Sequence, residues 1–269
     1  MKNNTLVSII TPCYNSSRFI GQMIDSIIAQ TYTNWELLIT DDCSSDNSRE
    51  IVQSYCQKDP RVKLFNLDKN SGAGVARNNS IKNAQGRYIA FCDSDDMWVP
   101  DKLEKQLRFL RGNGYKFTHT FTKVIDDHGA IVGINRKPVK VTFGSTKILN
   151  YIGTSSVLYD TEGIGKFYMR PIRRRQDWAL WLDILKVTKC AYCMEEPVSI
   201  YRYTPNSLSS NKLKLFKYHI TVYQECLGYS RLRAYLFFYC VSLPCIAYKK
   251  IAEKLREKLF KKRYSQMDL

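Results

Sequence analysis

Three carboxylates lie within four residues at Asp93-Ser94-Asp95-Asp96, directly after the apolar run 88–92. That run predicts a buried strand. The carboxylates therefore follow its carboxyl end, where open α/β sheets bind their ligands. Hard divalent cations are commonly held by carboxylates together with substrate phosphates. The alternative is a solvated acidic turn.

Two further charged groups follow predicted strands in the first half of the chain. Asp41 and Asp42 end a predicted strand at 35–40, and Arg77 lies in a helix that Gly72-Ala73-Gly74 opens. At one sheet edge they would converge with Asp93 and Asp95, and Arg77 could neutralise a phosphate. The glycines lack the third glycine of a dinucleotide fingerprint and do not follow the first strand, and no P-loop motif is present. We therefore expect a metal-bridged nucleotide diphosphate, and neither a dehydrogenase nor a P-loop ATPase.

A transferase also needs a base, and Asp177 is the candidate. It begins a helix predicted over 176–187, directly after three arginines at 173–175. The helix dipole and the arginines favour its ionised form. The alternative is a simple helix cap. Asp183 on the same helix is expected to be structural. The three histidines lie far apart without metal-ligand spacing, and only His119 falls in a strand near the presumed cleft.

Strands and helices must position these residues, and the first half alternates between them. Strands are predicted at 6–11, 35–40, 62–65 and 88–92, and helices at 19–30, about 51–55 and from 72 to a C-terminal cap at Gly86. This alternation predicts a parallel, doubly wound sheet. In the second half the patterns predict strands at 116–124, 131–132, 154–159 and 197–201, with a turn at 126–129.

Positive charge is concentrated in the second half of the chain. Residues 1–100 hold 10 Lys/Arg and 11 Asp/Glu, residues 101–210 hold 18 and 10, and residues 211–269 hold 13 and 4. Nine cysteines, an odd number, fit free thiols in a reducing compartment. The pair Cys190 and Cys193 is interpreted as strand residues. No signal peptide is recognisable, so a cytoplasmic location is expected.

The basic tail suggests contact with a membrane surface. Residues 234–248 are uncharged but fall short of the roughly 20 apolar residues that a spanning helix needs. Behind them, eight cations occur within 249–263 between regularly spaced apolar residues, which is typical of an interfacial amphipathic helix. The alternative is a helix that packs on its own domain. The expected divisions are a nucleotide-sugar half at 1–112, an acceptor half of the same domain at 113–210, and the tail at 211–269.

Taken in order, these motifs resemble family-2 inverting glycosyltransferases of the GT-A fold, as found in bacterial surface-polysaccharide synthesis. The segments that carry the resemblance are 7–15, 30–32, 36–42, 44–46, 74–78 and 86–96, with weaker matches at 177–182, 201–202 and 206–209. Gln176 stands where the family usually has Glu before the base.

The resemblance implies an α/β, Rossmann-like, doubly wound mixed sheet and a hexosyltransferase that uses a nucleotide sugar, most often a UDP-sugar, with Mn²⁺ or Mg²⁺. Pro12 and Tyr14 would border the nucleobase, and Asp42, in preference to Asp41, would bind its edge. Arg77 and Asp93 would hold ribose and diphosphate, Asp95 the metal, and Asp177 would be the catalytic base.

Two other functions remain open on the sequence. A sugar-phosphate nucleotidyltransferase has a similar sheet but favours a glycine-rich loop after its first strand, which 12–17 lacks. A basic nucleic-acid-binding protein fits the net charge of +16, but no nucleic-acid motif is recognisable and no such partner is expected. The expected partners are a nucleotide-sugar donor, a glycan or lipid-linked acceptor, and the inner membrane surface through residues 231–263. The expected location is the cytoplasmic face of the membrane.

Overall fold

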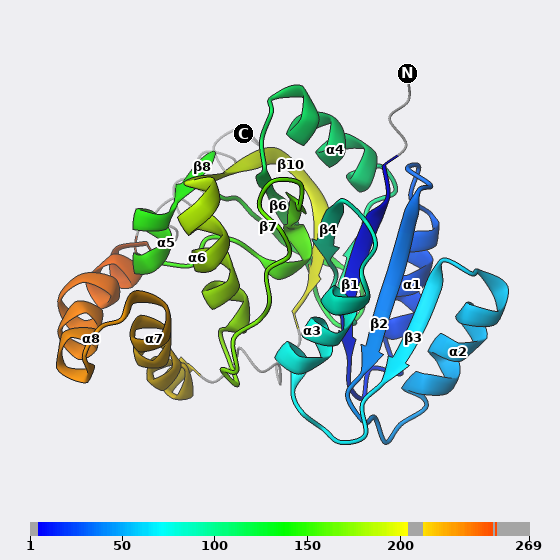
Figure 1. Ribbon diagram of the computed structural model, residues 1–269, viewed down its shortest axis with the longest axis horizontal. Coiled ribbons are helices and arrows are strands. Elements are labelled where there is room, and N and C mark those ends of the chain that lie inside the picture. The colour runs from blue at the N-terminus through cyan, green and yellow to red at the C-terminus, as the bar shows by residue number, and fades with distance from the viewer. Residues whose placement is uncertain (1–4, 204–211, 250, 252–269) are drawn as a thin grey trace, which may run out of the picture.

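Apolar runs in the first half of the chain form parallel strands within one large sheet (Figure 1). The computed structural model describes residues 5–203, 212–249 and 251. Within them the strand order is β3-β2-β1-β4-β9-β6-β10-β5, with β7 paired to β6 and β8 paired to β10. The strands are β1 (Val7–Cys13), β2 (Trp35–Asp41), β3 (Val62–Asn66), β4 (Tyr88–Phe91), β5 (Met97–Trp98), β6 (Phe117–Ile125), β7 (Ile131–Asn135), β8 (Lys140–Thr142), β9 (Leu158–Asp160) and β10 (Cys190–Arg202).

The sheet is mixed. β1 runs parallel to both β2 and β4, and β3 runs parallel to β2. β9 is antiparallel to its neighbours β4 and β6, whereas β6 and β10 are parallel. The parallel, doubly wound arrangement predicted for the first half is therefore confirmed, and so is the mixed sheet that the family resemblance implied.

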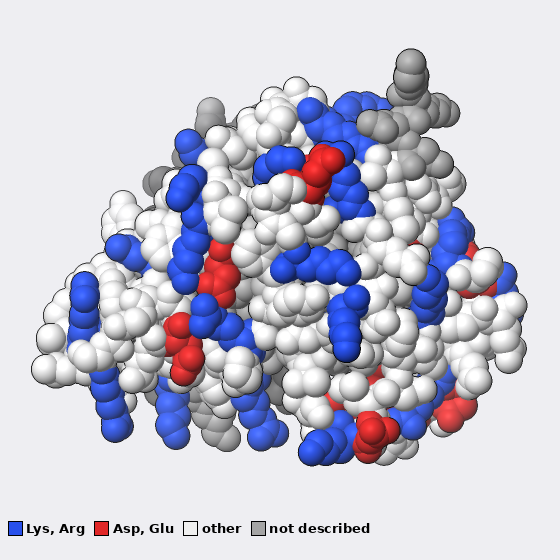
Figure 2. Space-filling view, in the orientation of Figure 1, with Lys and Arg blue, Asp and Glu red and all other residues white. Residues whose placement is uncertain are grey.

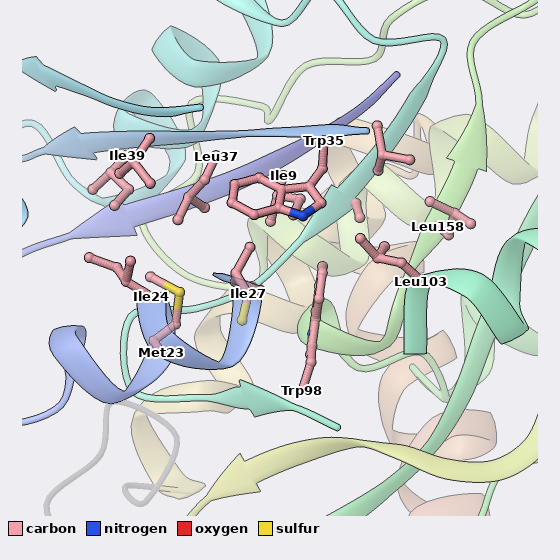
Figure 3. Packing of buried hydrophobic residues seen from close by; sticks show 14 of the residues in the cluster. Ile9, Met23, Ile24, Ile27, Trp35, Leu37, Ile39, Trp98, Leu103 and Leu158 are labelled. Atoms are coloured by element: carbon pink, nitrogen blue, oxygen red, sulfur yellow. The ribbon is translucent and has the colours of Figure 1, made fainter. Parts of the chain in front are cut away.

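Helices cover both faces of this sheet. They are α1 (Ile20–Ile28), α2 (Ser48–Lys58), α3 (Ala73–Asn83), α4 (Lys102–Gly112), α5 (Phe143–Ile148), α6 (Gln176–Thr188), α7 (Lys212–Leu227) and α8 (Arg231–Phe237). Alternation along β1 sends Ile9 to the core beneath α1 and α4, and Ile10 to the core beneath α3 and α6. Figure 3 shows Ile9 and Leu37 facing Ile27 of α1 in the first of these cores.

Gly86 does not cap α3, contrary to the prediction. The helix ends at Asn83, and its C-terminal cap is Ala84 in an extended conformation. A Cβ at Gly86 would lie 2.7 Å from the carbonyl oxygen of Leu6 and 2.7 Å from the backbone nitrogen of Ser8. The glycine is thus required for close approach to β1, which a pattern of local spacing does not reveal.

The second half departs from its predicted strands in two places. Residues 154–159 were expected to form one strand but divide into a 3₁₀ turn, Thr154–Ser156, and the short strand β9. The strand predicted at 197–201 is the second half of the longer β10, which also contains Cys190 and Cys193. Their interpretation as strand residues is confirmed.

The C-terminal helices pack on the outer side of α6. α7, α8 and the π-helical segment Phe238–Ser242 form a third core with α6, which includes Trp178, Tyr223 and Phe238. Among the described residues, no helix combines the length and the apolarity needed to cross a bilayer. Much of the basic amphipathic segment predicted at 249–263 lies outside the described residues.

Candidate active site

The loop Asp93–Asp96 follows β4 and is fixed by other segments of the chain. The backbone N–H of Asp93 donates to the Ser155 hydroxyl (3.1 Å), and the hydroxyls of Ser94 and Ser16 hydrogen-bond at 2.7 Å. Asp93, Ser94 and Asp95 are half-buried. A freely solvated acidic turn is therefore excluded, because two separate parts of the fold, at Ser155 and Ser16, hold this loop in one conformation.

Asp96 is the buried member of the loop. One carboxylate oxygen accepts from the Ser155 hydroxyl and the other from the Arg202 backbone N–H (3.1 Å). Burial and the charges of Asp95 and Asp93 raise its pKa well above the usual range. The Arg202 side chain also donates to the backbone carbonyl of Asp95 (3.3 Å). Sequence reasoning assigned no site role to Ser155 or Arg202, because nothing in the local pattern around either residue points to this loop.

Arg77 and Asp93 meet as the sequence predicted. The Arg77 guanidinium donates to a carboxylate oxygen of Asp93 at 2.5 Å, and the Arg77 side chain is nearly buried. Its Nε has no hydrogen-bond partner among the described residues. A buried guanidinium with an unused donor, adjacent to a partly exposed carboxylate, can accept an anionic ligand such as a phosphate.

Asp95 is the carboxylate of this loop with unused binding capacity. Within the described part of the chain, no other residue forms an ion pair or a side-chain hydrogen bond with its carboxylate. Burial, followed by the charge of Asp93, raises its pKa to about 6. A divalent cation would add positive charge to that of the nearby Arg202 and Arg77 side chains, so the residue fits a metal ligand.

A metal at Asp95 would need ligands from outside the protein. No group of three or more His, Cys, Asp or Glu residues among the described residues could hold a metal ion. Magnesium is often bound by one or two carboxylates, with water and substrate phosphates completing the shell. The donor set here fits that arrangement and does not fit a cage made wholly of protein ligands.

Asp41 and Asp42 at the end of β2 have different partners. Asp41 is buried and ion-paired with the Nε of Arg49 (2.6 Å). Asp42 accepts hydrogen bonds from the backbone N–H groups of Ser71 (2.6 Å) and Gly72 (2.7 Å). Gly72 has a φ of 92°, which favours glycine. Asp42 thus joins the end of β2 to the N-terminus of α3, and its remaining lone pairs are the ones available to a ligand.

The loop after β1 presents Tyr14 at the surface. Pro12 is buried at the end of the strand, whereas the Tyr14 side chain is half exposed. Asn15 has a left-handed backbone with φ of 47°, and its side-chain oxygen accepts from the Ser45 backbone N–H (2.9 Å). Asparagine tolerates this conformation better than most residues. The turn is therefore tied to the loop after β2, next to Asp42.

Asp177 lies in the first turn of α6, half-buried. Its carboxylate accepts a hydrogen bond from the Asn150 amide (3.3 Å). The preceding residue, Gln176, packs against α3 so closely that a Cβ at Gly74 would lie 3.1 Å from its Cγ. Hence the N-termini of α6 and α3 adjoin, and Asp177 is brought to the side of the sheet from which Arg77 reaches Asp93.

The remaining titratable groups stay outside this arrangement. Asp183 is ion-paired with Arg170 (2.7 Å) and Lys186 (2.9 Å), in agreement with the structural role predicted for it. His119 is fully buried in β6, and burial lowers its pKa to about 3, which makes the ring neutral at physiological pH. The other two histidines lie in the β6–β7 turn and in α7, so the three do not meet.

Comparison with known proteins matches the sequence of this chain to one family. The sequence profile described as "Glycosyl transferase family 2" matches residues 8–181. The chain is 42% identical over 221 residues to TuaG of Bacillus subtilis strain 168, named as a provisional teichuronic acid biosynthesis glycosyltransferase, covering 82% of this chain and 88% of TuaG. It is 39% identical to WfgD of Escherichia coli, a UDP-Glc:alpha-D-GlcNAc-diphosphoundecaprenol beta-1,3-glucosyltransferase, covering 79% of this chain and 83% of WfgD.

A solved structure shares the fold. Residues 1–349 of S. aureus TarS, crystallised with UDP-GlcNAc, superpose with a TM-score of 0.65 at 19% identity, covering 85% of this chain and 69% of TarS.

Proposed function

Because the chain belongs to glycosyl transferase family 2, and is thus a glycosyltransferase, we propose that it transfers a hexose from a UDP-sugar, with inversion, to a hydroxyl of a lipid-linked glycan. The observation that best supports this reaction is the position of the charged residues. The Arg77–Asp93 ion pair and Asp95 lie after β4, and the N-terminus of α6, which contains Asp177, packs against α3. Because the family consists of glycosyltransferases, we prefer this function to the two alternatives left open by the sequence, the nucleotidyltransferase and the nucleic-acid-binding protein.

The donor would bind along the ends of β1, β2 and β4. Tyr14 and Pro12 border the nucleobase, and Asp42, with Asp41 as the alternative, lies at its edge. Arg77, with its unused Nε, and Asp93 hold the ribose and the diphosphate. The choice of UDP is supported by WfgD, whose name specifies UDP-Glc. Because Arg77 is nearly buried, its charge acts in a poorly screened environment and favours a dianionic ligand.

Asp95 would be the protein's ligand for Mn²⁺ or Mg²⁺. When bound, such an ion supplies positive charge to the departing diphosphate. The support is its half-buried carboxylate, which has a raised pKa of about 6 and no cationic side-chain partner among the described residues.

Asp177 would act as the general base. It removes the proton from the acceptor hydroxyl as that oxygen bonds to the anomeric carbon, on the face opposite the diphosphate. The bond between the anomeric carbon and the diphosphate oxygen breaks with its electron pair leaving on the UDP. A single displacement inverts the configuration. Asn150 holds one oxygen of the Asp177 carboxylate, which leaves the other to accept the proton.

The acceptor and the location are proposed from the relatives. WfgD acts on a sugar linked to diphosphoundecaprenol, and TuaG is assigned to teichuronic acid biosynthesis. We therefore place this enzyme in surface polysaccharide synthesis, at the cytoplasmic face of the membrane, with a lipid-linked sugar as acceptor.

A donor screen tests the proposed reaction. The purified protein is incubated with UDP-, GDP- and dTDP-sugars, with and without Mn²⁺, and thermal stabilisation and slow donor hydrolysis are measured. We expect one UDP-sugar to stabilise the protein most, and only with the metal present. Preferential stabilisation and hydrolysis of a GDP- or dTDP-sugar would contradict the donor assignment.

Replacement of Asp95 tests the metal assignment. Calorimetric titration of UDP into the Asp95→Asn variant should show affinity that no longer responds to Mn²⁺, because the metal's protein ligand is removed. The matched control is Asp68→Asn, which removes the same charge at an exposed position after β3. If both variants keep the metal-dependent affinity of the unmodified protein, Asp95 is not the metal ligand.

A further inference from the structure

The last described helical segment has one face that packs and one that does not. Ala234, Phe238 and Ser242 follow at four-residue intervals and are buried against α7. The Ser242 hydroxyl hydrogen-bonds the buried Tyr223 hydroxyl of α7 at 2.7 Å. The orientation of α8 and of the π-helical segment on the domain is thereby fixed, so the residues opposite this face have a defined direction.

The opposite side carries large apolar side chains in contact with solvent. The exposed fractions are 71% for Leu232, 56% for Leu236, 59% for Tyr239, 76% for Tyr248 and 58% for Ile251. These five residues are called the apolar strip below. Single exposed apolar residues are ordinary on protein surfaces, but Leu232, Leu236 and Tyr239 recur at positions i, i+4 and i+7 along one side of the helical segment, and such a repeat marks an interaction site.

Positive charge flanks the apolar strip. Arg231 and Arg233 lie at the start of α8, at one end of the apolar strip. Lys249 lies at the other end of the strip, between Tyr248 and Ile251. No Asp or Glu occurs in the sequence from residue 226 to residue 251. Figure 2 shows blue side chains projecting from the end of the molecule where α7 and α8 lie. Apolar side chains on a segment whose charged residues are all cations match the headgroup region of a bilayer that contains anionic lipid.

We propose that the apolar strip lies in the interfacial region of an anionic lipid bilayer, with Leu232, Leu236 and Tyr239 among the acyl chains and the flanking cations at the lipid phosphates. Tyrosine suits this depth, because its ring is apolar and its hydroxyl is polar. The inference does not depend on the proposed reaction. It gives the domain a membrane-facing end formed by α8, attached through α7 to the same α6 that carries Asp177.

A second copy of the chain is the competing occupant, and the charges disfavour it. Two apolar strips packed face to face would place the cations of both copies, Arg231, Arg233 and Lys249, in one interface without any acidic residue of this segment to separate them. Like charges placed opposite one another across an interface suppress association. Anionic lipid, in contrast, supplies the missing negative charge.

Vesicle sedimentation tests the proposal with the full-length protein. Extruded vesicles of phosphatidylcholine alone, and of phosphatidylcholine with phosphatidylglycerol, are used without donor or acceptor, so the result is independent of any transferase activity. We expect binding to the phosphatidylglycerol vesicles. The variant Leu232→Ser/Leu236→Ser/Tyr239→Ser should bind them more weakly by roughly tenfold or more. This variant keeps every cation and all of residues 252–269.

The matched control removes exposed apolar side chains elsewhere. Ile131, Val132 and Val139, around β7, are 64%, 60% and 55% exposed, and the variant that replaces all three with serine should bind like the unmodified protein. Unchanged unfolding temperatures would show that all variants are folded. Equal binding by the apolar-strip variant, or binding that only the β7 variant loses, would overturn the proposal. So would a dimer in analytical ultracentrifugation that the apolar-strip variant abolishes, without vesicle binding by the unmodified protein.

Discussion

Arg175 precedes the proposed base by two residues and has a left-handed backbone, with φ of 66°. For a residue other than glycine this conformation costs on the order of 1 kcal/mol. Its Nε is buried without a hydrogen-bond partner among the described residues. Strain of this kind persists only where the surroundings enforce it, and it is concentrated at functional sites. The turn that aims Asp177 is thus maintained at the expense of stability.

Replacing Asp177 by asparagine should separate catalysis from donor binding. The variant keeps the shape of the side chain but cannot take a proton, so we expect the transfer rate to fall by roughly 10² to 10⁴. Because the donor contacts are proposed to come from other residues, the Kd for UDP should stay unchanged. Initial rates and calorimetric titration measure the two effects. A transfer rate close to that of the unmodified enzyme would refute the assignment.

The control for this variant lies on the same helix. Asp183→Asn breaks the ion pairs with Arg170 and Lys186, so it should lower stability while leaving the transfer rate nearly unchanged. A comparable loss of activity in both variants would mean that damage to α6, and not loss of a base, explains the effect.

Lys102 gives a residue-level prediction about pH. Its ammonium group is fully buried, 3.7 Å from the centroid of the Trp98 ring, and donates to the side-chain oxygen of Gln106 (2.9 Å). Burial lowers its pKa from 10.5 to about 7. Below pH 7 the lysine is protonated in the folded and unfolded states, so the cost of burying the charge is present in full. Between pH 7 and the unfolded-state pKa the folded state binds fewer protons, and this cost declines.

The Lys102→Met variant removes that dependence. Relative to the variant, the unmodified protein should gain up to about 1.4 kcal/mol of unfolding free energy per pH unit between pH 7 and 10. Urea unfolding of both proteins across this range measures the difference. Parallel stability curves would show that Lys102 titrates normally and has access to water in the folded state.

At the scale of helices and strands, the sequence was most informative where an element is buried in a regular pattern. The strands at the centre of the sheet are buried along their whole length, and α6 carries apolar residues at helical spacing, so both were predicted from local spacing. The two-residue strand β5 and the three-residue strand β8 were not predicted. Each exists only because β10, far along the chain, pairs with it.

Gly86→Ala is the prediction that belongs to this scale. The new Cβ would meet backbone atoms of residues 6 and 8 at 2.7 Å, and backbone cannot move aside as a flexible side chain can. We expect a loss of roughly 2 kcal/mol or more in unfolding free energy. Gly112→Ala is the control, since this glycine ends α4 with nothing within 4 Å of the added Cβ and should gain some tenths of a kcal/mol. Equal effects of the two substitutions would refute the close-approach argument.

At the scale of the whole molecule, one sheet joins the two halves of the domain, for which the sequence suggested a division at residue 112. β5 of the first half pairs with β10 of the second, and α6 contributes Trp181 to the core under the sheet and Trp178 to the core with α7 and α8. We therefore predict one cooperative unfolding transition, with equal calorimetric and van't Hoff enthalpies. Two resolved transitions in differential scanning calorimetry would show that the halves, or the C-terminal helices, unfold independently.

Some residues of the candidate site could be predicted from the sequence and others could not, and the difference has a physical reason. Asp93 and Asp95 could be proposed because they follow a strand end, and Asp177 because it begins a helix. Arg77 could be proposed because it lies in the helix behind a glycine turn. Ser155 and Arg202 could not, because their roles come from contacts that span 59 and 106 residues of sequence and leave no local pattern. A sequence pattern shows which helix, strand or loop contains a residue. It does not show that Ser155 and Arg202 contact a loop that is distant from them in the sequence.

The same long contacts set an order for events during synthesis of the chain. The parallel strands β1 to β4 are complete once residue 91 has emerged, and their connections are short, so this part can form early. The loop after β4 must wait for Ser155 and then for Arg202 before Asp96 has its partners. A nascent chain shorter than about 200 residues therefore has the sheet edge for the nucleotide but no rigid acidic loop. Activity on the ribosome should begin only after β10 has left the exit tunnel, before α7 and α8 have emerged from it.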